Sequence, residues 1–247
     1  KTIQIFSGTV VKNEKSPSLI KRRSYAIERT LGEGENGTQA EYLKGAVPNE
    51  FTLNIPQAEK LNVDMGFIAC DNVYVSGDPG DELEEGTRVP ALGEDAYNTS
   101  SDIYRIKMHV HDPATANPTP LFGFVSEGNI SISNGVTARK AVGVLGAFET
   151  SAGNFEVGGS VTAYFSTVAA VKAIRANADV GLSIIGAARN AGFVYDIPLM
   201  SLGGGRQKKK KDEPIMVPLE PAGAENKYGY TLLSEVFSYL PNLAMPD

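Results

Sequence analysis

Two histidines lie close together in the sequence and have the side chains best suited to bind a metal. His109 and His111 are separated by one residue. Residues i and i+2 of a strand point to the same face, so both imidazoles are placed to ligate zinc. The chain contains only these two histidines, and carboxylates would have to complete such a site. A solvated polar face that continues Arg105 and Lys107 is the simpler interpretation; a metal-dependent hydrolase is the enzymatic alternative.

A basic segment at residues 203–212, GGGRQKKKKD, combines glycines with lysines and suggests phosphate binding at first sight. A P-loop needs Gly-Lys-Ser/Thr between a strand and a helix. No such tripeptide occurs here, and Pro214 with a strand-like segment follows. We therefore interpret the segment as a flexible basic loop. Its consecutive lysines are Lys208, Lys209, Lys210 and Lys211.

An acidic cluster lies within residues 76–102, a segment rich in glycine and proline. Its carboxylates are Asp81, Glu82, Glu84 and Glu85. Their spacing does not match the calcium-binding loop of an EF-hand. We predict a long exposed loop, and loops of this length are usually functional or disordered. One hypothesis is that these carboxylates pair with the four lysines of another subunit, so that charge reversal of the lysines would change assembly and its salt dependence.

The single cysteine, Cys70, follows the apolar residues Phe67, Ile68 and Ala69. A catalytic thiol needs a nearby base, so a buried and unreactive thiol is the default interpretation. One cysteine cannot form an internal disulfide, which fits assembly in a reducing compartment.

The elements that would carry these residues are mainly strands. From Glu127 to Ser166, apolar side chains alternate with small polar ones, as at Ile130 and Ile132, and Asn134-Gly135 marks a turn. Such a pattern builds a surface rather than a reaction centre. Both histidines belong to another predicted strand, Ile103 to His111. One face of this strand carries the mainly apolar residues Tyr104, Ile106, Met108 and Val110. The other face carries the polar residues Arg105, Lys107, His109 and His111.

Two further elements stand out in the second half of the chain. Residues 180–186 and 193–202 are predicted to form a hairpin. The best helix candidate is Thr167 to Ala178, whose apolar stripe of Val168, Val171 and Ile174 we expect to pack across a sheet.

Composition narrows the class of protein. The chain has 247 residues, 26 glycines and 14 prolines, which suits short strands and turns in one large domain. With a formal net charge of −6, stable binding to DNA or to anionic membranes is not expected. No apolar run approaches the roughly 20 residues that span a membrane, so we expect no stable membrane insertion.

Several segments together resemble the major tail tube proteins of long-tailed bacteriophages, and non-contractile siphophage tails in particular. The resemblance covers most of the chain through strand pattern and order. Its segments are Lys21 to Arg29, Ala46 to Ile55, Ile130 to Ser166, Ile215 to Leu219 and Gly229 to Pro241. The acidic loop and the lysine loop have no counterpart in this pattern.

The resemblance implies a mainly β fold, a β-sandwich or barrel-like tail tube domain over residues 1–247 with one flanking α-helix and long loops. In such proteins six subunits form a ring, and rings stack into a hollow, electronegative tube that conducts DNA into the host without binding it. The implied partners are other copies and the tape measure, tail tip and terminator proteins. The implied location is the virion tail, after assembly in the bacterial cytoplasm. A tail-tip or baseplate protein of the same fold is the alternative.

No enzymatic activity, cofactor or metal is expected under this interpretation. The candidate functional residues are instead contacts between rings. They are the acidic cluster, the four lysines, and the basic residues Lys21, Arg22 and Arg23.

Overall fold

The fold is described from a computed structural model that covers residues 9–16, 18–20, 22–78, 81, 83–91, 93, 95–111, 119–165, 168–188, 191–204 and 214–237. Within these residues the chain forms fifteen strands and one short helix. The expectation of a mainly β protein is therefore confirmed.

The bounds of the elements follow the chain from end to end. The strands of the first half are β1 (Thr9–Val11), β2 (Tyr25–Gly34), β3 (Gly37–Ile55), β4 (Asn62–Ile68), β5 (Asp71–Gly77), β6 (Ile103–Val110) and β7 (Thr119–Pro120). The second half contains β8 (Val125–Ser133), β9 (Thr137–Arg139), β10 (Glu149–Ser151), β11 (Glu156–Tyr164), α1 (Val168–Arg175), β12 (Val180–Ala188), β13 (Ala191–Gly204), β14 (Met216–Gly223) and β15 (Leu232–Phe237).

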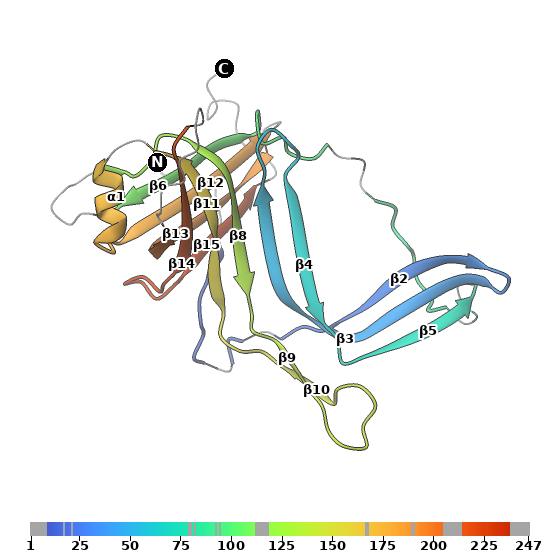
Figure 1. Cartoon of the computed structure of the whole chain (residues 1–247). Coiled ribbons are helices and arrows are strands. Elements are labelled where there is room, and N and C mark those ends of the chain that lie inside the picture. The colour runs from blue at the N-terminus through green and yellow to red at the C-terminus, as the bar shows by residue number, and fades with distance from the viewer. Residues whose placement is uncertain are drawn as a thin grey trace, which may run out of the picture.

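Thirteen of these strands form one open sheet, whose main path runs β2-β3-β8-β11-β14-β13-β12-β6-β7. The sheet folds over so that β4, β3, β8 and β11 make a first layer in front of a second layer of β6, β12, β13 and β15 (Figure 1). Strand β14 joins the layers because it pairs with both β11 and β13. The remaining strands, β9 and β10, form a separate hairpin.

The core lies between the two layers. Leu53, Ile130 and Val161 of the first layer are at most 2% exposed, as are Leu182 and Ile197 of the second. All five belong to one continuous apolar cluster. Burying a side chain of this size contributes about 1.5–3 kcal/mol relative to leaving it exposed, so this interface is the main source of stability.

An arm extends from the body and consists of β2, the first part of β3, and β5 (Figure 1). Strand β3 is shared, because residues 37–44 pair within the arm and residues 50–55 pair with β8. The arm has a small apolar cluster of its own, made by Ala40, Tyr42 and Leu83.

Some elements match their prediction and others do not. The hairpin is confirmed, since β12 and β13 are antiparallel and Ala188 pairs with Ala191. Residues 67–75 do not form one continuous strand, because β4 ends at Ile68 and β5 begins at Asp71. The chain turns there because β4 belongs to the body and β5 to the arm.

The helix is shorter than the predicted segment, with eight residues in two turns. Ile174 enters the core and Val171 is half-buried, but Val168 is 63% exposed in the single chain. The prediction that Val168 packs on the sheet is therefore wrong, because only the second turn of the helix reaches the core. Among the described residues, no helix is long and apolar enough to cross a membrane.

Candidate functional site

A polar surface formed by four strands is the most distinctive surface of the body. Because paired residues of antiparallel strands point to the same side, the register defines its members. We call this surface the polar sheet face. It consists of Asn62, Asp64 and Gly66 of β4, Glu50, Thr52 and Asn54 of β3, Glu127, Asn129, Ser131 and Ser133 of β8, and Glu156, Gly158, Ser160 and Thr162 of β11.

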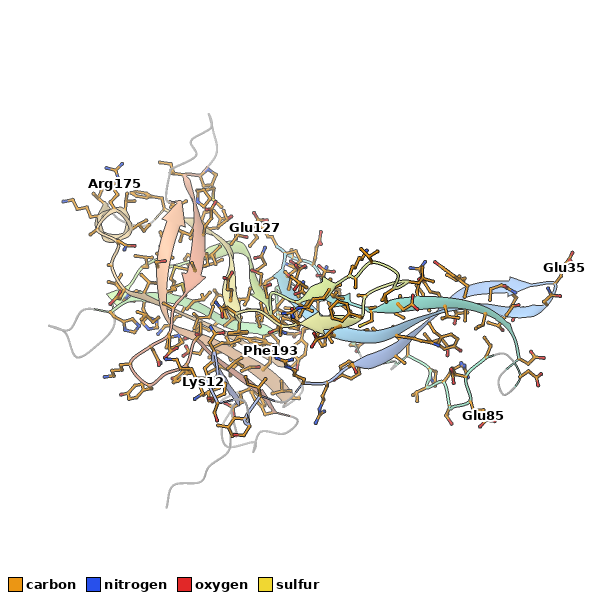
Figure 2. The ribbon with its side chains drawn as sticks, turned by 90° about the horizontal axis from the view of Figure 1, so that it is seen from below. Lys12, Glu35, Glu85, Glu127, Arg175 and Phe193 are labelled. Atoms are coloured by element: carbon orange, nitrogen blue, oxygen red, sulfur yellow. The ribbon has the colours of Figure 1, made fainter. Side chains whose placement is uncertain are left out.

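The charges on the polar sheet face are all negative. Glu50, Asp64, Glu127 and Glu156 are exposed, and no lysine or arginine occupies any of its positions. Figure 2 shows Glu127 on one side of the body and Lys12 on the other. The face therefore presents a surface of one sign of charge, which repels anions.

Hydrogen bonds fix the amide side chains of this face. The Asn54 amide nitrogen donates to Asn62 Oδ1 and Asp64 Oδ2, each at 2.7 Å. The backbone N–H of Ser160 donates to Asn129 Oδ1 at 2.9 Å. These bonds lie along the face, so the amides are held there instead of projecting as long mobile side chains.

A glycine makes the pairing of β8 with β11 possible. Gly159 has a φ of +153°, and a Cβ at this position would lie 2.2 Å from the carbonyl oxygen of Asn129. Only a residue without a side chain fits both the dihedral and the close approach. The glycine at position 159 thus allows the close approach of β8 and β11.

The two histidines lie elsewhere, at the end of β6. Their rings are 4.9 Å apart in an edge arrangement, above Gly181, which leaves room for them. The Nε2 atom of His111 is 2.8 Å from the carbonyl oxygen of Pro198. Burial, followed by the neighbouring His111, lowers the pKa of His109. In the described part of the chain, no group of three or more His, Cys, Asp or Glu side chains is arranged to hold a metal.

The acidic loop is not wholly exposed, which corrects the prediction. Asp81, Glu84 and Glu85 are exposed, but Leu83 is only 4% exposed because it packs into the apolar cluster of the arm. Figure 2 shows Glu85 beside the arm, well away from Glu127.

An ion pair attaches the same loop to β2. The Arg88 guanidinium donates to both carboxylate oxygens of Glu28 at 2.8 Å, and the Tyr42 hydroxyl donates to Glu28 at 3.1 Å. The hydrogen bond from Arg88 lowers the pKa of Glu28, and that from Tyr42 acts in the same direction. The sequence analysis did not predict this ion pair, because Glu28 and Arg88 are 60 residues apart and no local pattern links them.

The remaining predicted contact residues are only partly covered. Arg22 and Arg23 are exposed and line a pocket with Val136 and Thr150. Lys21, Glu82 and the four lysines 208–211 lie outside the described residues, so the predicted pairing of acidic and lysine loops stays a prediction. Cys70 is half-buried at the junction of body and arm.

A family model described as phage tail tube protein matches residues 3–222. A comparison with curated proteins gave no match.

Proposed function

Because that match spans most of its length, the chain belongs to the phage tail tube protein family, and we propose that it forms hexameric rings that stack into the hollow tube of a non-contractile tail. Membership makes it a structural protein of the virion tail that assembles with itself and with other tail proteins. The ring, the channel and the tail type belong to the proposal.

The observation that supports the proposal is the polar sheet face. A conduit for DNA must not retain it, and each cation on phosphate adds affinity through the release of counterions. Four carboxylates and no cation on four neighbouring strands suit the wall of such a channel. We propose that this face lines the bore and that the core and second layer lie outside it.

The number and spacing of the strands are consistent with a tube whose bore is wide enough for duplex DNA. Four strands from each of six subunits make about 24 strands, which at about 4.8 Å apart give a circumference of roughly 115 Å before tilt. The corresponding bore of a few tens of Å accommodates duplex DNA. Closure of the ring also covers the edge of β4, which pairs only with β3 within the described residues.

The proposed tube also implies where the chain is assembled and which partners it meets. The chain is assembled in the host cytoplasm, contacts the tape measure, tip and terminator proteins, and lets DNA pass without binding it. Its role is structural rather than enzymatic; a stoichiometric zinc content after dialysis, with hydrolytic activity lost on mutation of His109, would contradict this.

A tail-tip or baseplate protein of the same fold is the second candidate. Electron microscopy of the concentrated, purified chain separates the two. Hollow tubes with a regular axial repeat are the expected result. Single rings that do not grow would favour the tip protein, and a monomer at all concentrations would contradict both.

A further inference from the structure

A loop with an apolar tip projects from the body and is not used in the proposed channel. It spans residues 140–148 between β9 and β10, and we call it the apolar loop (Figure 1). Val142 is fully exposed at 105%, and Leu145 is 92% exposed. Large apolar side chains gathered at one exposed tip indicate a surface that another molecule covers.

The base of the apolar loop is anchored, so its tip is held away from the body. The N–H of Ala147 donates to the Cys70 carbonyl at 2.7 Å, and the N–H of Phe148 donates to the Arg139 carbonyl at 3.0 Å. Gly146 has a φ of +77°, and a Cβ there would lie 2.7 Å from the Cys70 carbonyl oxygen. This close approach requires glycine and fixes where the loop leaves the body.

The same chain carries an apolar groove at the edge of the first layer, and its volume is about 640 Å³. We call it the β4 groove. Its apolar lining includes Tyr25, Ile27, Phe51, Met65 and Phe67. The volume is within the range of about 300–1,000 Å³ that is typical of pockets that enclose a small ligand.

The β4 groove exists because the core side of β4 extends past the second layer. Val63 pairs with the buried Leu53, and Met65 pairs with Phe51, so both point to the core side of the sheet. Yet Val63 is 44% exposed and Met65 59% exposed. These apolar side chains lie on the core side of the sheet but are exposed in the single chain. An apolar partner that covers them would extend the core.

We propose that the apolar loop of one copy inserts into the β4 groove of another copy. No residue of the loop lines the groove of its own chain. Self-assembly within this family supplies the second copy, and both surfaces are apolar and uncovered in the single chain. A contact between two different surfaces of identical chains repeats from copy to copy and generates rings or filaments.

This inference rests on the proposed function, because it identifies the segments by which copies of a tube subunit hold one another. It assigns the contact to the apolar loop rather than to the acidic or lysine loops. Hydrophobic burial at its centre predicts that assembly tolerates salt, whereas contacts between charged loops would weaken as salt screens them.

Disulfide trapping between two populations of the full chain tests the contact. Both populations carry Cys70→Ala; one also carries Leu145→Cys and the other Met65→Cys. After oxidation under assembly conditions, we expect covalent dimers in the mixture and none in either population alone. As a control, Tyr228→Cys, at an exposed residue outside the loop and the groove, replaces Leu145→Cys and should not cross-link. Equal yields from control and test mixtures would overturn the proposal.

A second variant keeps the test independent of cysteine chemistry. Leu145→Asp should abolish sedimentable assemblies at a concentration where the unmodified chain forms them, and Tyr228→Asp should not. The thermal unfolding of both variants should match that of the unmodified chain, because both residues are exposed. Failure of the unmodified chain to form tubes would contradict the proposed function; tubes from Leu145→Asp would contradict only this contact.

Discussion

At the scale of single residues, the polar sheet face depends on side chains that are small, acidic or absent. Asn54 and Asn129 accept or donate hydrogen bonds along the sheet and leave no long side chain above it. Gly159 lets β8 and β11 approach each other where any Cβ would collide with the Asn129 carbonyl.

Replacement of Gly159 by alanine should therefore destabilise the fold. We expect the free energy of unfolding to fall by about 1–3 kcal/mol or more, the usual cost of a side chain in a sparsely populated backbone region. Chemical denaturation of the unassembled chain measures this. Gly123→Ala is the matched control, because a Cβ there would meet nothing within 4 Å. Equal unfolding free energies of the two variants would contradict the account of this position.

At the scale of elements, the acidic loop is attached to the arm at two points. Leu83 is buried in the cluster with Tyr42, and Arg88 is paired with Glu28 on β2. The loop therefore follows the arm rather than moving freely, and only its exposed carboxylates remain available to other copies.

This attachment should weaken in acid. Glu28 has a folded-state pKa below its ordinary value of 4.5, so its contribution is complete above that pH and is lost as the pH falls through the folded-state pKa. Hydrogen exchange of residues 83–91, corrected for its intrinsic pH dependence, should thus accelerate as the pH falls below 4.5.

Arg88→Ala should remove this acceleration and give fast exchange already at neutral pH. Arg22→Ala is the control, since Arg22 is exposed and is not part of the ion pair between Arg88 and Glu28. An exchange rate in the unmodified chain that does not change on acidification would show that the ion pair does not hold the loop.

Much of the element pattern could be predicted, because alternation is a local property. Met108 is buried while Arg105 and Lys107 are exposed, as the two-residue period of β6 indicates. The polar sheet face could not be predicted, because Asn54 meets Asn129 only through the register of β3 with β8. The burial of Val168 was predicted wrongly, because helical spacing does not reveal which turn of a helix reaches the core.

At the scale of the whole molecule, charge is divided between surfaces. The net charge of −6 alone says little about where anions are repelled. The fold places four carboxylates on one sheet face, and no lysine or arginine occupies a position of that face. Arg105 and Lys107 belong to β6 of the second layer and share a pocket with Glu127 at the end of β8.

Placing a cation on the polar sheet face should make assembled tubes retain DNA. Ser131→Lys adds one lysine per subunit to the proposed bore, and a short duplex should then co-sediment with tubes. Binding should weaken steeply between about 50 and 200 mM salt, as expected for contacts to phosphate. Val168→Lys, on the exposed start of α1, is the control. No retention by Ser131→Lys tubes, or equal retention by both variants, would contradict the assignment of the bore.

The most direct test of the central claim is a helical reconstruction of assembled tubes by cryo-electron microscopy at side-chain resolution. The account predicts hollow tubes built from stacked six-fold rings, with β4, β3, β8 and β11 lining the bore and Glu127 pointing into it. A tube whose bore is lined by the outward face of β6 and β12, or a chain that forms no tube, would contradict it.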